Sequence, residues 1–265
     1  MADESNADLL LQKAECLAAY GRHLAHSMGG RTSQWQNVVC CDAGLASAYR
    51  NLVVPLRPVS VVAAKELAVH LARFYDSRRK WALWSVFSLD LAGTDFEHSC
   101  SDTLSMRRPQ PSPVMNTPDV AGLVIREVTD DADVKLFEQV RETANGRVPV
   151  IAAGSRLDDR ILGNGYHLWL GLLNGLAVAT AAIFESDAVS MVKSISTLPG
   201  FRHRGIGSAM TVHAVSMSNK PAILDSSLDA AGLYARVGFE EVGRVQFWGR
   251  KSPEWQARTK LMANE

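Results

Sequence analysis

Two rhythms of hydrophobic and polar positions organise the second half of the chain. Short apolar or alternating runs predict strands at residues 120–128, 166–173, 176–184, 188–197, 221–226 and 239–250. Apolar positions that recur every three or four residues predict helices at residues 130–145, 205–217 and 228–237. The resulting order, β-α-β-β-β-α-β-α-β, is typical of a mixed α/β layered domain.

Turn and cap signals support these boundaries. Asn174-Gly175 separates two apolar runs, and this pair favours a two-residue hairpin because both turn positions need positive φ. Asp130 or Asp131 is a suitable N-cap for the first helix. Gly238 follows the third helix, where a left-handed C-cap is expected.

The N-terminal part begins with a predicted helix. Leu10, Leu17 and Leu24 recur every seven residues, and Gly29-Gly30 follows. Such an apolar face most simply packs on its own domain, and a partner-binding face is the alternative. A second helix is predicted at residues 61–75.

The N-terminal and C-terminal parts of the chain share a weak internal sequence similarity. Residues 80–97 resemble residues 220–240, since both read as a strand, Ser-Leu-Asp, a short helix with glycine, and Phe-Glu. This similarity suggests two related halves, although it is short enough to arise by chance.

A proline-rich segment separates the halves. Pro109, Pro111, Pro113 and Pro118 lie between residues 107 and 118, and proline disfavours both helix and central strand. The sequence therefore predicts a domain at 1–108, a linker at 109–119 and a second domain at 120–265.

Composition and charge exclude several classes of protein. The 265 residues are 47% hydrophobic, and 28 basic residues balance 28 acidic ones, so a strongly basic nucleic-acid binder or a polybasic membrane-surface protein is not expected. The four cysteines have no CxxC spacing, so neither a metal site nor a disulfide scaffold is predicted. The N-terminus is acidic and no apolar run approaches about 20 residues, which predicts a cytoplasmic protein.

The segment from Ser196 to Met210 contains the residues that predict a ligand-binding site. A strand ends near Thr197, a turn with two arginines and two glycines follows, and a helix starts at once. Free N–H groups and the positive end of the helix dipole form a cradle for a pyrophosphate. A Walker loop is excluded because no Gly-Lys-Ser/Thr follows, and the GxGxxG dinucleotide fingerprint is absent.

The pattern Thr197-x-Pro199-x-Phe201-Arg202-x-Arg204-Gly205-Ile206-Gly207 resembles motif A of the GCN5-related N-acetyltransferase (GNAT) superfamily. Residues 233–240 are similar to the family's "LYEKxGF" segment, and the resemblance covers residues 121–250. It implies a GNAT-like mixed sheet flanked by helices, with acetyl-CoA as co-substrate. With the internal sequence similarity it suggests two such domains in tandem, the first degenerate because Pro58 stands where the turn needs glycine.

The resemblance also implies roles for individual residues. Tyr234 would protonate the leaving thiolate as the catalytic acid. The residues implied to bind the cofactor are Ile195, Ser196, Thr197, Leu198, Arg202, His203, Arg204, Gly205, Ile206, Gly207, Ser208, Ser227 and Arg236. Ser227 stands where many members carry asparagine.

The general base is not readable from the sequence. Some members carry a glutamate on the strand before motif A, and this strand has none. Glu185 and Asp187 are the nearest carboxylates, although a solvated turn is their simpler role. His167 and Lys193 are further candidates, and a water relay is another.

The expected activity is transfer of an acetyl group from acetyl-CoA to a primary amine of a small molecule or peptide, by direct attack, in a monomer or homodimer. The alternatives are a non-catalytic acyl-CoA-binding regulatory protein and an interaction protein that uses its N-terminal half. The aromatic residues of that half, Trp35, Trp81 and Trp84, are expected in the core.

Overall fold

The computed structural model describes residues 6–77, 79–91, 93–98, 103–110, 118–146 and 156–250. The chain forms two compact units, which consist of residues 1–105 with 242–265 and of residues 106–241. It enters the second unit along β6 (Thr103–Arg108) and returns to the first along β12 (Glu240–Arg250). Strands therefore cross both boundaries. Arg107 and Arg108, expected in an extended linker segment, end β6, and residues 111–117 lie outside the described part.

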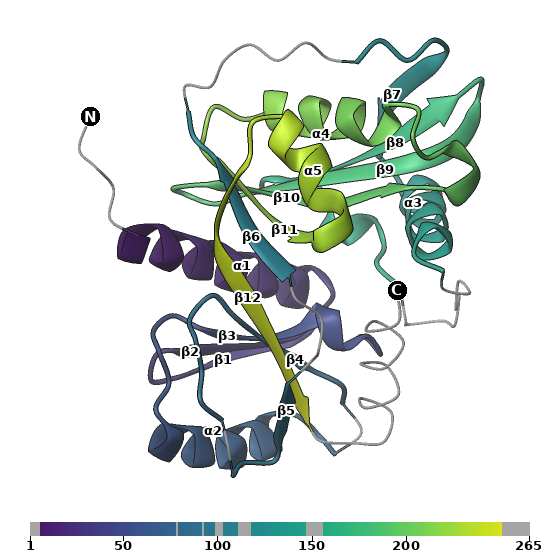
Figure 1. The fold of residues 1–265 in the computed structure, drawn as a ribbon. Helices are drawn as coiled ribbons and strands as arrows, with labels where there is room; N and C mark the ends of the chain where they lie inside the picture. Colours follow the sequence, from purple (N-terminus) through teal and green to yellow (C-terminus); the bar gives the residue numbers. More distant parts are fainter. Residues whose placement is uncertain are drawn as a thin grey trace. The chain divides into compact units, whose positions relative to one another are not determined.

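The first unit builds a sheet between two helices (Figure 1). Its elements are α1 (Asn6–Ser27), β1 (Arg31–Trp35), β2 (Val38–Asp42), η1 (Ala48–Arg50), β3 (Asn51–Pro55), α2 (Val61–Phe74), β4 (Ala82–Ser85) and β5 (Phe96–His98). The strand order is β1-β2-β3-β4, with β12 next to β4 and β5 on β12. The last predicted strand thus completes the sheet of the first unit from Val242 onward.

Alternation along β2 and β3 explains this packing. Leu52 and Cys41 approach Gly21 of α1, whereas Cys40 and Val53 belong to a buried cluster with the leucines of α2. Because successive strand residues point to opposite faces, strands buried on both faces are apolar at nearly every position. In β2 and β3 the exceptions are Asp42 and Asn51. Trp81 and Trp84 are buried, and Trp35 is partly buried against the same cluster as Trp81. Trp81 and Trp84 are therefore core residues, as predicted, and Trp35 packs at the edge of the core.

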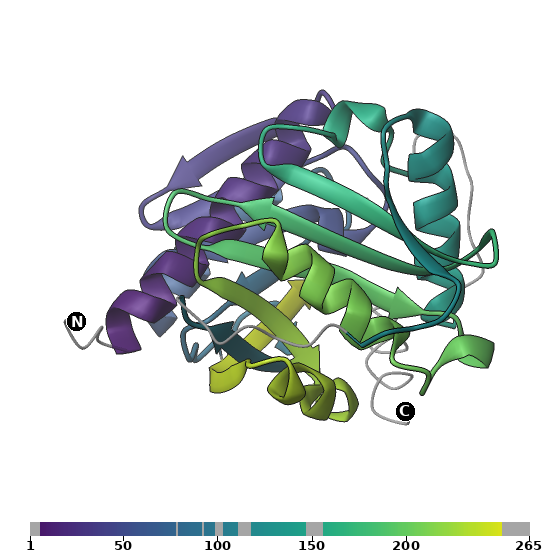
Figure 2. The ribbon, with the colours of Figure 1, turned by 90° about the horizontal axis from the view of Figure 1, so that it is seen from above.

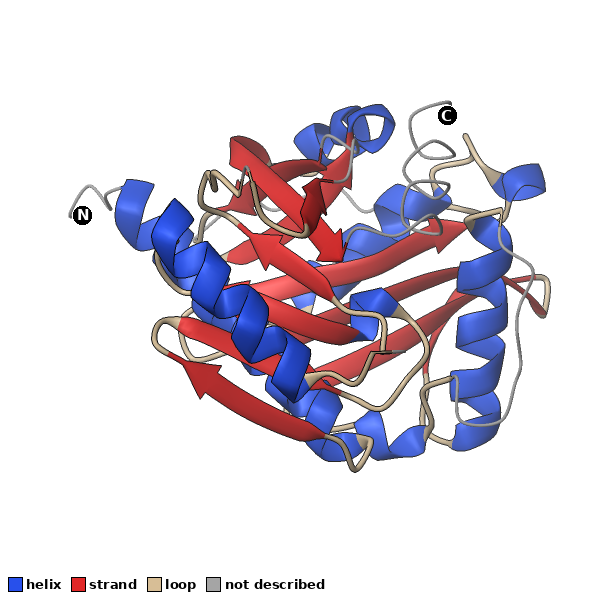
Figure 3. Ribbon diagram, turned by 90° about the horizontal axis from the view of Figure 1, so that it is seen from below, coloured by secondary structure: helices blue, strands red, loops and turns tan. Residues whose placement is uncertain are grey.

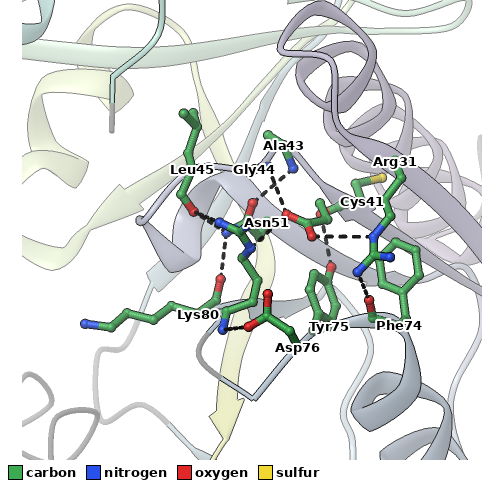
Figure 4. A network of polar contacts seen from close by, with 12 residues as sticks. Arg31, Cys41, Ala43, Gly44, Leu45, Asn51, Phe74, Tyr75, Asp76 and Lys80 are labelled. Atoms are coloured by element: carbon green, nitrogen blue, oxygen red, sulfur yellow. Dashed lines mark hydrogen bonds and ion pairs between the residues drawn. The ribbon is translucent and has the colours of Figure 1, made fainter. Parts of the chain in front are cut away.

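A buried asparagine ties the end of this sheet together (Figure 4). Asn51 Nδ2 donates to the carbonyls of Leu45 and Lys80, both at 2.7 Å, and its Oδ1 accepts from the Ala43 amide at 3.0 Å. The neighbouring Tyr75 hydroxyl donates to the Cys41 carbonyl at 3.0 Å. These side chains therefore satisfy backbone groups at the end of the sheet.

The second unit repeats the plan of a sheet covered by helices. Its elements are β7 (Leu123–Glu127), α3 (Asp131–Ala144), η2 (Asp159–Ile161), β8 (Tyr166–Leu173), β9 (Leu176–Glu185), β10 (Ser190–Thr197), η3 (Pro199–Phe201), α4 (Ile206–Ser216), β11 (Ala222–Ser227) and α5 (Leu228–Arg236). The strand order is β11-β10-β9-β8-β7. Figure 2 shows α4 lying across these strands, and Figure 3 shows strands in red with helices in blue packed on them.

The local predictions for this unit are confirmed. Asn174 and Gly175 both have positive φ, 51° and 82°, in the β8–β9 hairpin. Asp130 caps α3 by accepting from the Asp133 amide. Gly238 follows α5 with a φ of 84°. The mixed α/β fold expected from the order of elements is therefore observed.

The two units share a topological core. In the first, β3 leads through α2 to the parallel strand β4, and in the second, β10 leads through α4 to the parallel strand β11. The two units differ in one element. A helix, α5, follows β11 in the second unit, whereas the helix expected after β4 does not form among the described residues between β4 and β5. Instead, the Leu89 amide is held at 2.9 Å by the side chain of Gln246.

Candidate active site

A bulge shapes β10. Lys193 pairs with Ala182 and Ser196 with Thr180, so β10 carries one residue more than β9 over this interval. Ser194 lies in the bulge with a φ of 54°, a left-handed conformation that is uncommon for serine. Thr180 Oγ1 donates to the Ser194 carbonyl at 2.7 Å. A bulge bends the strand and re-aims the residues that follow it.

The pairing of β10 with β11 ends before the bulge. The two parallel strands pair at Ser190–Ala222 and Met191–Ile223, whereas pairing with β9 continues to Thr197. In the described strands, the β11 side of β10 is therefore open beyond Met191. Ile195, Ser196, Thr197 and Leu198, the predicted pantetheine segment, lie at this end of the strand. The Leu198 amide itself donates to the Val178 carbonyl on β9.

The predicted phosphate loop follows directly. His203 and Gly205 have φ values of 61° and 80°, so the chain turns through two left-handed residues before α4 starts at Ile206. The first i to i−4 bond of the helix joins the Ala209 amide to the Gly205 carbonyl. The amides of Ile206, Gly207 and Ser208 therefore form the first turn, where N–H groups lack helical acceptors and the dipole is positive. This geometry suits a bound anion.

Gly207 joins the loop to the rest of the site. A Cβ at this position would lie 3.0 Å from Leu233 Cδ1 on α5 and 3.8 Å from Thr197 Oγ1 on β10. A side chain at this position would crowd the Leu233 methyl group, which would have to move aside. The glycine thus lets three predicted elements of the site approach one another: the end of β10, the first turn of α4, and α5.

Tyr234 lies on α5 and is 7% exposed. Its ring contacts Phe239 edge-to-face, with 6.0 Å between centroids. Burial raises the pKa of the Tyr234 phenol to about 12. The hydroxyl therefore stays protonated at neutral pH and is available as a hydrogen-bond donor.

The remaining predicted residues occupy different settings. Ser227 is exposed at the N-cap position of α5, and its side chain makes no capping bond. Arg236 is exposed in the last turn of that helix. Arg204 is exposed, with its guanidinium carbon 5.5 Å from the Phe201 ring centroid. Arg202 instead bonds to two backbone carbonyls, those of Thr197 and Ala144.

Lys193, one of the candidate bases, lies on β10 at the start of the bulge, and the other three lie further from the phosphate loop along the chain. Glu185 pairs in register with Ser190, at the start of β10, seven residues or about 23 Å of strand before Thr197. Its carboxylate lies 3.6 Å from Lys220 Nζ. Asp187 is exposed in the turn between β9 and β10. His167 Nδ1 lies 2.9 Å from Glu127 Oε1, on the β7–β8 edge of the sheet.

Two residues of this region escaped the sequence analysis. Thr180 is fully buried and holds the bulge, and Asn145 donates at 3.4 Å to Ser196 Oγ. Thr180 had a detectable signal, because it is the one hydroxyl within the apolar run of residues 176–184. A lone buried hydroxyl requires a partner. Asn145 gave no such signal in the sequence, because Ser196, the residue to which it donates, lies 51 positions further along the chain.

Neither a metal-ligand cluster nor a membrane-spanning helix is found among the described residues. No group of three or more His, Cys, Asp or Glu side chains there could hold a metal ion. No helix in that part of the chain is long and apolar enough to cross a membrane.

Comparison with known proteins gives one sequence match. Residues 164–241 match the family model described as acetyltransferase (GNAT) domain. The match runs from the start of β8 through α5 and ends where the second unit ends. No curated protein matches the chain.

Solved structures match over most of the length. A GCN5-related N-acetyltransferase from Kribbella flavida is 18% identical, with a TM-score of 0.69 over 94% of this chain and 98% of that one. Another from Sphaerobacter thermophilus is 16% identical, with a TM-score of 0.52 over 81% and 76%. A tandem GNAT protein from the clavulanic acid biosynthesis pathway is 12% identical, with a TM-score of 0.51 over 80% and 77%. At these identities the structures show the fold. The chain therefore has the fold of the GCN5-related N-acetyltransferases, and residues 164–241 match the GNAT domain model.

Proposed function

We propose that this protein is an N-acetyltransferase that moves the acetyl group of acetyl-CoA to a primary amine. One observation carries the proposal: the unpaired end of β10 is followed by a short loop and by α4, whose N-cap is Gly205. The pyrophosphate would lie on the amides of His203 to Ser208, and the pantetheine arm along residues 195–198. This arrangement matches a ligand that joins an anionic group to an extended amide chain.

The second unit would supply orientation and a proton donor. The neutral amine attacks the thioester carbonyl, the C–N bond forms, and the C–S bond then breaks. The amine loses one proton to solvent and the thiolate gains one. Tyr234 is the donor in this proposal, because burial keeps its phenol protonated. A positioned acid contributes about 10²–10⁴-fold.

Calorimetric titration of acetyl-CoA tests the cofactor and its site together. We expect binding to the wild type and none to Gly205→Glu, which would place a carboxylate at the pyrophosphate. Gly163→Glu is the matched control, since Gly163 has a φ of 82° and open space around it in the same unit. Equal binding by wild type and Gly205→Glu would refute the site. Loss of binding in both glutamate variants would mean that backbone strain, rather than the phosphate loop, explains the effect.

A non-catalytic acyl-CoA-binding protein is the second candidate. It is favoured by the absence of any carboxylate on β10 and by the pairing of Glu185 with Lys220. Release of free CoA in the presence of a panel of small amines and peptides separates the two functions. Binding without acceptor-dependent release would favour the second candidate.

A further inference from the structure

The guanidinium of Arg202 connects two elements of the second unit. Its Nε donates to the Thr197 carbonyl at 3.1 Å, and its Nη2 donates to the Ala144 carbonyl at 2.6 Å. Thr197 is the last residue of β10, and Ala144 is the last residue of α3. One side chain thus holds the end of a strand and the end of a helix together.

The contact suits the C-terminus of α3. The last four carbonyls of a helix have no helical donor, and the dipole is negative there, so a cation that donates to one of them is doubly favoured. Hydrogen bonds from charged donors contribute more than neutral ones. Arg202 therefore stabilises the final turn of α3 as well as the end of β10.

A second bond links the same two segments. Asn145, the C-cap of α3, donates from Nδ2 to Ser196 Oγ at 3.4 Å and to the Arg141 carbonyl at 2.6 Å. The final turn of α3 is therefore attached to Ser196 and Thr197, two of the residues proposed to bind pantetheine. These residues border the open side of β10.

Arg202 and Arg204 are both exposed, but their guanidinium groups have different partners. The guanidinium of Arg204 lies over the Phe201 ring, whereas that of Arg202 donates to two backbone carbonyls. An arginine in this state can turn toward an incoming phosphate at little cost. Arg202 would first have to release two charge-assisted bonds.

From this contrast we infer that Arg202 is a positioning residue that fixes the pantetheine strand against α3, and that Arg204 supplies the side-chain charge for the pyrophosphate. The inference rests on the proposed function for its ligand. It assigns different tasks to two arginines that are only two positions apart.

The test compares Arg202→Lys, Arg202→Gln and Arg204→Gln in the full chain. Lysine keeps the charge but not the planar fork that reaches two carbonyls. We expect both Arg202 variants to lower kcat/KM for acetyl-CoA by about tenfold, with affinity for ADP, which carries the pyrophosphate but no pantetheine arm, unchanged within about twofold. Arg204→Gln should weaken ADP and acetyl-CoA alike and reduce the salt dependence of both. Wild-type behaviour of Arg202→Lys together with weakened ADP binding by Arg202→Gln would overturn the inference, because charge alone would then explain the role of Arg202.

Amide hydrogen exchange, measured without ligand, tests the role of Arg202 independently of the proposed function. Arg202→Gln should speed amide exchange in the last turn of α3 and at the end of β10, and Arg204→Gln should not. Asn145→Ala should give a smaller change in the same segments. Unchanged exchange in Arg202→Gln would overturn the link, even if acetyl-CoA bound as proposed. Absence of acetyl-CoA binding by the wild type would instead refute the proposed function, whatever the exchange rates.

Discussion

Thr180 Oγ1 lies 2.7 Å from the carbonyl oxygen of Ser194, the residue that adopts a φ of 54° in the bulge of β10. Thr180 is fully buried, and its hydroxyl is the one polar side-chain group in the apolar run of residues 176–184. The bond satisfies a carbonyl in the irregular part of the ladder. The shape of the proposed pantetheine strand therefore depends on a side chain from the neighbouring strand.

Replacing Thr180 with valine should relax the bulge. Valine keeps the volume but leaves the Ser194 carbonyl without its donor, which costs about 1–3 kcal/mol. We expect a lower urea midpoint and weaker acetyl-CoA binding. Thr180→Ser keeps the hydroxyl and is the control. If valine changed stability but not affinity, the bulge would be irrelevant to the cofactor.

Tyr234→Phe should separate chemistry from binding. Phenylalanine keeps the edge-to-face contact with Phe239 and removes only the hydroxyl. We expect kcat to fall about 10²-fold while the acetyl-CoA dissociation constant changes less than twofold. Because burial raises the pKa of Tyr234 to about 12, ionisation of this phenol should leave no limb in the pH–rate profile below about pH 11. An unchanged kcat would remove the acid role.

His213 should make the second unit sensitive to acid. It lies on α4 beside Trp169, with 5.1 Å between ring centroids, and its Nε2 is buried without a hydrogen-bond partner. Burial lowers the pKa of His213 below its ordinary value of 6.5, and the charge of Glu127 opposes this only in part. The unfolded chain therefore binds the proton more readily, so the free energy of unfolding should fall as the pH drops below about 6.5.

His213→Gln tests that expectation by urea denaturation at pH 7.5 and pH 5. The variant should lose less stability than the wild type over this interval. His26→Gln, at an exposed position on α1, should lose as much as the wild type. Identical pH dependence in wild type and His213→Gln would show that the buried imidazole does not govern acid stability.

One molecule of acetyl-CoA should bind per chain. In the first unit, α2 occupies the place that α4 has in the second, but Ser60 caps it by accepting from the Ala63 amide. Pro58 removes a further N–H donor from the preceding turn. Calorimetry should therefore give a stoichiometry near one, and two sites would contradict the assignment of a single phosphate loop.

The sequence similarity between the two halves of the chain predicted only part of the structure that the two units share. The similarity of residues 80–97 to 220–240 predicted the strands that became β4 and β11. It also predicted a helix after β4, which is wrong for the described residues because Gln246, 157 positions later, holds the Leu89 amide in a loop. Local composition cannot anticipate a bond to a strand contributed by the far end of the chain.

The sequence alone determined the elements whose causes are local. The positive φ at Asn174 and Gly175, the Asp130 cap and the glycine after α5 all follow from properties of a few adjacent residues. The tertiary structure decided what depends on distant partners: the return of β12 to the first unit, the Thr180 bond to the bulge, and the attachment of Arg202 to α3. These contacts join residues from 14 to 163 positions apart, as with Thr180 and Ser194 or Trp84 and Phe247. Such pairs meet only after the sheets have formed, and for that reason local patterns do not encode them.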